Sequence, residues 1–111
     1  MSFSLETIPL FEKEVKRLFR KYPSLKKVLV KLVEILEVNP TQGISLGNNF
    51  YKIRLAITSK AKGKSGGARV ITLVKVLQEK VYLSAIYDKN EQANISDKEL
   101  KLIADDISSL M

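Results

Sequence analysis

The first half of the chain combines a strand-like and a helix-like spacing of hydrophobic residues. Residues 2–7 place polar and apolar side chains in turn, which is typical of a short strand. From Pro9 the apolar residues recur at helical spacing, and we expect this helix to stop before Pro23 because proline restricts the residue ahead of it. The same spacing resumes after Ser24, the expected N-cap, and ends at Asn39-Pro40. These two helices predict a helical hairpin.

The second half changes to the two-residue period of strands. Residues 50–58 alternate strictly: one face carries Tyr51, Ile53, Leu55 and Ile57, and the other carries Lys52, Arg54 and Thr58. Residues 69–77 and 81–87 predict two further strands, and the turn between them is short enough for an antiparallel hairpin.

The C-terminal part has a well-marked helix start. Ser96 and Glu99 have the spacing of a capping box, and Ile95 and Leu100 occupy the two positions of a hydrophobic staple. A hydrophobic stripe follows, so we expect the final helix to pack back on the sheet.

The order of these elements predicts an α+β fold. We expect an N-terminal strand and a helical hairpin packed on an antiparallel sheet of about four strands, followed by a C-terminal helix. The hairpin would cover one sheet face and leave the other free to bind. The length of 111 residues suits one domain over residues 1–111.

The charge is concentrated in the middle of the chain. Residues 50–78 contain seven basic and no acidic side chains, so this segment alone carries a charge equal to the net +7 of the whole chain. A soluble surface normally mixes both signs. A one-sign block on a small domain indicates a polyanionic partner.

The chain contains no cysteine and no histidine. Disulfides, thiolate nucleophiles, the usual zinc sites and histidine acid/base pairs are therefore excluded, and we expect no metal and no cofactor. No apolar run is long enough to span a membrane and no signal peptide is recognisable, so we expect a cytoplasmic location. Membrane-surface binding is an alternative for the basic face of the first helix, but its apolar stripe is what a core-facing helix needs.

The segment around Gly63-Lys64-Ser65 shares its last three residues with a phosphate-binding P-loop. The full motif fails, because Thr58 stands where the first glycine is required and a strand rather than a helix follows. We interpret the segment as a flexible basic arm whose lysines contact RNA phosphates. The alternative is a hairpin tip kept soluble by the same lysines; they are Lys60, Lys62 and Lys64.

Three cations are expected to converge on the sheet. Lys52 and Arg54 share one strand face, and Arg69 begins the strand expected beside it. Such a cluster suits a phosphate, since arginine binds it with two hydrogen bonds and stabilises the charge of a phosphoryl transition state. The alternative is a solvated basic sheet face.

Tyr87 and Lys89 stand at the end of the last expected strand. The tyrosine could stack on a base or move a proton, with a nearby lysine lowering its pKa. The alternative is a tyrosine packed under the C-terminal helix.

The sequence resembles the RelE/ParE superfamily of toxins from type II toxin–antitoxin systems, in particular the HigB/RelE-like branch. The likeness rests on the order of elements, on the strand segment Tyr51-Lys52-Ile53-Arg54-Leu55, and on residues 63–71, Gly-Lys-Ser-Gly-Gly-Ala-Arg-Val-Ile. It spans nearly the whole chain.

The resemblance implies a metal-independent, ribosome-dependent endoribonuclease that cuts mRNA and inhibits translation. It implies Arg69 as the group that stabilises the pentacovalent phosphate, Lys52 or Arg54 for proton abstraction or charge balance, and Tyr87 or Lys89 on the leaving side. Lys89 or Asn90 stands where such toxins often carry a further arginine, and a tail tyrosine has no counterpart after Ala93.

Other functions share this fold. A ParE-like toxin blocks gyrase without cutting RNA, and a member with weak catalysis keeps only the RNA-binding face. For a toxin, the implied partners are mRNA, the ribosome and a cognate antitoxin that wraps the helices or fills the basic face with acidic side chains. An acidic segment that folds onto the chain would match the charge. The sequence predicts no oligomeric state.

Overall fold

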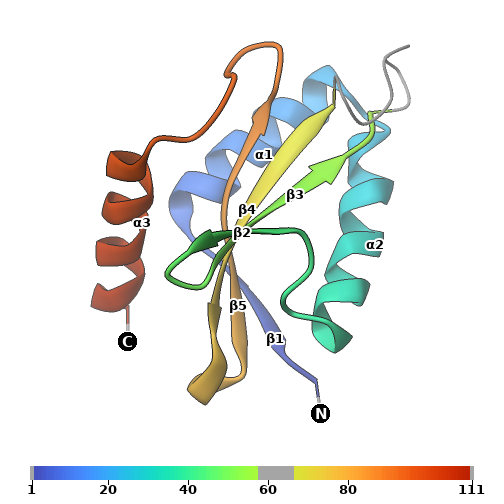
Figure 1. Ribbon diagram of the computed structural model, residues 1–111. Helices are drawn as coiled ribbons and strands as arrows, with labels where there is room; N and C mark the ends of the chain where they lie inside the picture. The colour runs from blue at the N-terminus through green and yellow to red at the C-terminus, as the bar shows by residue number, and fades with distance from the viewer. Residues whose placement is uncertain (1, 58–66, 111) are drawn as a thin grey trace.

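The computed structural model describes residues 2–57 and 67–110 (Figure 1). Three α-helices and a five-stranded sheet make up this part of the chain. In chain order the elements are β1 (Ser4–Thr7), α1 (Pro9–Lys21), α2 (Leu25–Val38), β2 (Ile44–Gly47), β3 (Phe50–Leu55), β4 (Ala68–Lys75), a 3-10 turn (Val76–Gln78), β5 (Lys80–Asp88) and α3 (Asp97–Ser109). The predicted α+β class is confirmed.

The sheet has the strand order β1-β5-β4-β3-β2. Neighbours pair antiparallel, except that β1 runs parallel to β5 at the edge. The strand absent from the prediction is β2, which is only four residues long. Its turn into β3 uses Asn48 and Asn49 at φ 53 and 66, a left-handed conformation that asparagine tolerates.

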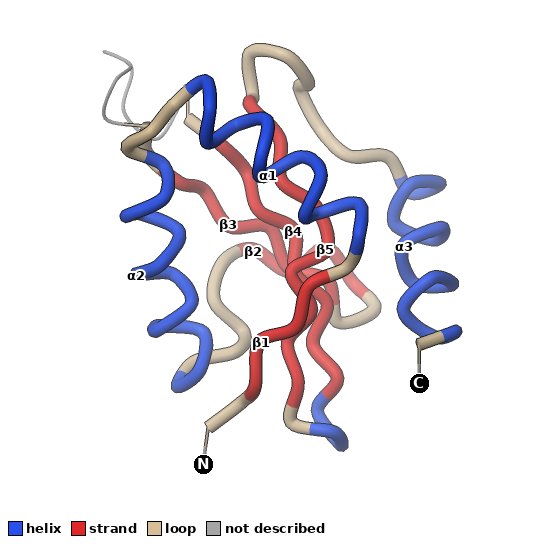
Figure 2. Tube along the Cα trace, turned by 180° about the vertical axis from the view of Figure 1, so that it is seen from behind, coloured by secondary structure: helices blue, strands red, loops and turns tan. Residues whose placement is uncertain are grey.

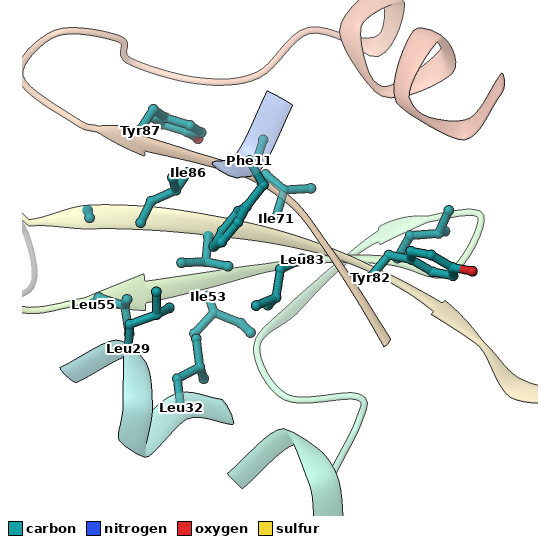
Figure 3. Packing of buried hydrophobic residues seen from close by; sticks show 14 of the residues in the cluster. Phe11, Leu29, Leu32, Ile53, Leu55, Ile71, Tyr82, Leu83, Ile86 and Tyr87 are labelled. Carbon is teal, nitrogen blue, oxygen red and sulfur yellow. The ribbon is translucent and has the colours of Figure 1, made fainter. Parts of the chain in front are cut away.

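The helical hairpin covers one face of the sheet (Figure 2). Helix α1 ends at Lys21 and α2 begins at Leu25, as the prolines and the hydrophobic spacing predict. The buried leucines of α2 include Leu29 and Leu32, which lie toward Ile53 and Leu55 of β3 in Figure 3. Because strand side chains alternate, this contact decides which β3 residues face the helices.

The prediction that Ser24 caps α2 with its side chain is wrong. Ser24 occupies the N-cap position, but its backbone is helical (φ −65, ψ −19) rather than extended, and its side chain makes no cap hydrogen bond. The hydroxyl is buried without a hydrogen-bond partner in the described part of the chain. The turn after α1 is too tight to give Ser24 the extended backbone that a cap requires.

Helix α3 flanks the β5 side of the sheet (Figure 1). The predicted capping box is confirmed, since Glu99 N donates to Ser96 Oγ at 3.1 Å and Ser96 N donates to Glu99 Oε1 at 3.3 Å. Leu100, Ile103 and Ile107 are buried, as expected for a helix that packs back on the fold. None of the helices in the described ranges is long and apolar enough to cross a membrane.

Candidate functional site

Three of the predicted site residues form one row across the sheet. In the strand register Arg54 of β3 pairs with Arg69 of β4, and Arg69 pairs with Tyr87 of β5. Side chains in such cross-strand pairs lie about 5 Å apart at Cβ. Since Ile53 and Leu55 face the helices, the row lies on the opposite face of the sheet (Figures 1 and 3).

Lys52 lies one row away on the same face. It pairs with Ile71 and stands two residues before Arg54, so its side chain points to the same side. Lys52 is half-buried and Arg54 is exposed. The diagonal separation from Lys52 to Arg69 is about 7–8 Å. The structure therefore places Lys52, Arg54 and Arg69 over one small area of the sheet.

Arg69 is the most confined cation of this group, with 3% of its surface exposed. Its Nη1 donates to the carbonyl of Ala68 at 3.2 Å. Burial lowers the pKa of Arg69, the charge of Arg54 lowers it further, and Tyr87 opposes the shift. A guanidinium nevertheless stays protonated at neutral pH. An anion bound here would replace lost hydration and reduce the repulsion between the two arginines.

Tyr87 lies beside Arg69 but is 4% exposed, and its hydroxyl has no hydrogen-bond partner within the described ranges. It lines a cavity of about 410 Å³ that also contacts Leu10 of α1 and Leu102 and Ile103 of α3. Burial raises the pKa of Tyr87, and Glu99 raises it too, while Arg69 acts in the other direction. The expectation that a nearby lysine lowers this pKa is therefore wrong, because desolvation outweighs the neighbouring cation.

Lys89 follows the row at the end of β5. Its side chain is exposed, and its backbone N–H donates to the carbonyl of Gly67 at 3.1 Å. This bond holds Lys89 next to the start of β4. The three loop lysines of the predicted RNA-binding arm, Lys60, Lys62 and Lys64, lie outside the described residues.

Gly67 allows β3 and β4 to close at this end of the sheet. A Cβ atom built on Gly67 would lie 1.9 Å from the carbonyl oxygen of Leu55, much closer than any side-chain atom can approach. The sequence predicted a flexible arm around Gly63-Lys64-Ser65, and Gly67 stands two positions after Ser65. In the structure Gly67 permits close contact between two backbones.

A buried carboxylate follows Tyr87 and ties β5 to α1. Asp88 is fully buried, and its oxygens accept hydrogen bonds from Tyr22 Oη at 2.9 Å and from Asn90 N at 3.0 Å. Lys21 Nζ lies 4.0 Å from the same carboxylate. The charge of Asp88 is thus compensated within the fold, as burial requires.

A second carboxylate extends this link toward solvent. Glu91 forms ion pairs with Arg17 at 2.8 Å and with Lys21 at 3.0 Å. The hydrogen bonds from Arg17 and Lys21 lower the pKa of Glu91. Sequence reasoning missed this network, since its partners are about seventy positions apart and Tyr22 fits the apolar stripe of α1.

The chemistry available on this face is that of fixed cations. No group of three or more residues of the metal-binding kinds comes together in the described part of the chain. Two adjacent arginines and a lysine can bind a phosphate and stabilise charge that grows on it. This combination fits phosphate chemistry on a nucleic acid.

Two comparisons with known proteins identify the family and support the fold. Residues 10–110 match the family model described as the RelE toxin of the RelE / RelB toxin-antitoxin system. The fold is also similar to the solved structure of an E. coli RelE toxin mutant in the free state, with a TM-score of 0.61 and 17% sequence identity. That similarity covers 84% of this chain and 90% of the E. coli chain. The protein therefore belongs to the RelE toxin family of toxin–antitoxin systems.

Proposed function

We propose that this toxin is a metal-independent endoribonuclease that cuts mRNA on the ribosome and so stops translation. The observation that carries the proposal is the row Arg54–Arg69–Tyr87, with Lys52 beside it on the same sheet face. Family membership supports a coarse assignment as a toxin with nuclease character.

The proposed reaction is attack of an RNA 2′-hydroxyl on the adjacent phosphate. A bond forms between the 2′-oxygen and phosphorus, and the bond from phosphorus to the 5′-oxygen breaks. The products are a 2′,3′-cyclic phosphate and a 5′-hydroxyl, so one proton leaves the attacking oxygen and one reaches the leaving oxygen. Arg69 would hold the phosphate and stabilise its added negative charge, as a preorganised donor in a desolvated position.

The proton acceptor is best assigned to Lys52. Arginine stays protonated in proteins, which leaves Arg54 to balance charge, whereas the Lys52 amine accepts a proton when it is neutral. Both stand on the face that carries Arg69. The reaction would therefore use three basic residues, Arg69 and Arg54 as cations and Lys52 as the proton acceptor.

The leaving side is best assigned to Lys89. The Lys89 side chain is exposed next to the end of the row, whereas the Tyr87 hydroxyl is buried. In this proposal the Tyr87 ring supports Arg69 from the neighbouring strand, and Lys89 protonates the 5′-oxygen.

Replacing Tyr87 with phenylalanine tests that assignment. We expect Tyr87→Phe to cut mRNA at close to the native rate and to fold at least as stably, because the lost hydroxyl is buried and makes no hydrogen bond. A matched Lys89→Ala variant should lose activity instead, by about a hundredfold for a lost general acid. A large loss of cleavage in Tyr87→Phe would return the proton-transfer role to the tyrosine.

The same variant has an expected pH signature. The raised pKa means that the folded protein resists ionisation of Tyr87, so this residue contributes no pH dependence below its ordinary value of 10.0 and lowers stability as the pH rises above it. Tyr87→Phe should therefore lose less stability than the native chain above pH 10, measured by urea unfolding across the alkaline range.

A purified translation system tests the function itself. Adding the protein should produce cuts in the translated mRNA, with a cyclic phosphate and a 5′-hydroxyl at the new ends, and leave DNA gyrase unaffected. Accumulation of gyrase-cleaved DNA with intact mRNA would instead show a gyrase-blocking toxin. RNA binding without cuts in translated mRNA would identify a member that keeps only the binding face.

The partner that neutralises this toxin is proposed to be a cognate antitoxin with an acidic segment. Lys52, Arg54 and Arg69 give the sheet face a positive charge that such a segment would cover. Binding of the antitoxin would then block access of RNA to the same residues.

A further inference from the structure

The turn after β5 carries Lys89 and is held by Asp88. The Asp88 carbonyl oxygen accepts hydrogen bonds from the backbone N–H groups of Glu91 at 2.9 Å and of Gln92 at 3.0 Å. The Lys89 N–H donates to the carbonyl of Gly67 at 3.1 Å. The backbone on both sides of the Lys89 side chain is therefore fixed to its neighbours.

The two carboxylate oxygens of Asp88 serve different partners. Oδ1 accepts a hydrogen bond from Asn90 N at 3.0 Å, and this bond closes the turn around Lys89. Oδ2 accepts one from Tyr22 Oη at 2.9 Å, at the end of α1. The orientation that Tyr22 gives to the carboxylate is therefore the orientation in which the carboxylate holds Asn90.

Tyr22 is itself held in place. Its backbone N–H donates to the carbonyl of Leu18 at 2.8 Å, and its carbonyl accepts from Leu25 N at 3.0 Å. The Lys21 amine lies 5.4 Å from the centre of the Tyr22 ring, within the range of a cation–π contact. Helix α1 in turn packs against β5 (Figure 2). The Tyr22 hydroxyl thus reaches Asp88 from a rigid part of the fold.

A buried carboxylate is a costly means of joining a helix to a strand. Asp88 has no exposed surface, and a charge taken out of water must regain its lost hydration from partners inside the protein. Apolar side chains of similar volume often hold such a contact equally well. An apolar side chain cannot accept the Asn90 N–H, however, so the carboxylate adds a fixed direction for the turn.

Lys89 depends on this turn for its position. Its side chain is exposed and lysine has a flexible stem, so the reach of its amine is set by where its backbone lies. A displacement of about 1 Å can cost a factor of about a hundred in rate when a catalytic group must meet a reacting atom. The turn begins directly after Tyr87, the last member of the row on the sheet. A small change in the turn would therefore change the reaction at the neighbouring phosphate.

We propose that Asp88 is a positioning residue for Lys89, and that Tyr22 holds Asp88 in the orientation that this role requires. The inference rests on the proposed function, since proton transfer from Lys89 is part of it. Neither Asp88 nor Tyr22 touches RNA in this scheme. Helix α1 contributes to the reaction through a chain of hydrogen bonds that ends at the turn after β5.

Tyr22→Phe tests the role by kinetics, because phenylalanine keeps the ring and removes only the hydroxyl. Cleavage of a defined mRNA on purified ribosomes should show a kcat about tenfold lower and a KM within about twofold of the native value. In a Lys89→Ala background, Tyr22→Phe should cost less than about twofold more, since no amine is left to position. A second full tenfold loss in that background would overturn the proposal.

Asp88→Ala extends the same test to the carboxylate. It should lower kcat at least as far as Tyr22→Phe, because the Asn90 N–H loses its acceptor directly. Adding Tyr22→Phe to Asp88→Ala should then change kcat by less than about twofold, and a further tenfold loss would contradict a role for Tyr22 through Asp88. If urea unfolding shows that Asp88→Ala does not fold, the result for Tyr22→Phe decides.

Two control variants separate positioning from loss of stability. Glu91→Gln weakens the exposed ion pairs with Arg17 and Lys21 but keeps the bond from Tyr22, so cleavage should stay within about twofold of the native rate. Ile8→Val trims the core at the other end of α1, which should lower the urea midpoint and leave kcat native. A loss of kcat in Ile8→Val equal to that in Tyr22→Phe would show that stability alone sets the rate and would overturn the proposal.

Amide hydrogen exchange, followed by NMR on the purified protein, tests the positioning without catalysis. Tyr22→Phe should speed exchange of the Asn90 N–H by about tenfold, because the carboxylate that accepts it is no longer held. Unchanged exchange in this variant would overturn the proposal, even if the native chain cut mRNA. Faster exchange would support the positioning of the turn even if the native chain cut none, and the proposed function alone would then fail.

Discussion

Replacing Arg69 with alanine is expected to lower the rate of mRNA cleavage by about a hundredfold to a thousandfold, the usual effect of removing one donor to a transition-state anion. The expectation rests on position. Arg69 is the middle member of the row and is 3% exposed, so water cannot replace its contribution to the phosphate.

Loss of activity in this variant should not come from unfolding. Burial and the charge of Arg54 both lower the pKa of Arg69, which means that the folded state carries a cost for this cation. Removing the charge relieves the repulsion with Arg54, while the lost packing and the lost hydrogen bond to the Ala68 carbonyl act in the opposite direction. We therefore expect Arg69→Ala to keep an unfolding midpoint near that of the native chain, measured by urea unfolding.

Two further variants sharpen the result. Arg69→Lys retains a charge but loses the two parallel hydrogen bonds of the guanidinium, so it should recover only part of the activity. Lys75→Ala removes a cation at the other end of β4 and serves as the matched control, with native activity expected. If purified, folded Arg69→Ala cut translated mRNA as fast as the native chain, the role given to Arg69 would be wrong.

The sequence predicted the three helices and four of the five strands because each of these has a local signal. The alternation over residues 50–58 indicates which side Lys52 and Arg54 face, and the capping box of α3 follows from two residues three positions apart. The pairing of Arg54 with Arg69 depends on the register of two strands that are separated by the loop. Alternation alone leaves that register open.

The features that the sequence did not predict depend on contacts between distant segments. Burial of Tyr87 results from the position of α3, and the bond from Tyr22 to Asp88 joins residues 66 positions apart. Strand β2 is too short to show a period. In each case the neighbour that decides the outcome lies elsewhere in the chain, so local patterns carry little information about it.

The candidate site lies at the end of the sheet where β4 begins and where β3 and β5 end. Gly67 precedes β4, Lys89 follows β5, and their backbones are joined by a hydrogen bond of 3.1 Å. Asp88 anchors the same end to α1 through Tyr22. The arginine row is therefore supported by backbone contacts and a buried polar link, as a preorganised phosphate site requires.

Replacing Gly67 with alanine is expected to destabilise the fold by about 3 kcal/mol, at the upper end of the usual range for overpacking. The new Cβ would meet the Leu55 carbonyl oxygen at 1.9 Å, and both atoms belong to backbones held by the pairing of β3 with β4. This clash can be relieved only if β3 and β4 move apart at the end of the sheet where Arg54 pairs with Arg69. Cleavage activity should therefore fall together with stability.

Gly47→Ala is the matched control for the glycine itself. Gly47 has φ +87 but no atom within 4 Å of an added Cβ, so alanine there meets conformational strain without a clash, at a cost of about 1–2 kcal/mol. Gly67 has no positive φ, which leaves the steric contact as the source of its larger expected effect. Urea unfolding of both variants gives the comparison, and an mRNA-cleavage assay on each shows whether the loss extends to the site. Gly67→Ala with native stability and native cleavage would mean that β3 and β4 do not approach each other this closely.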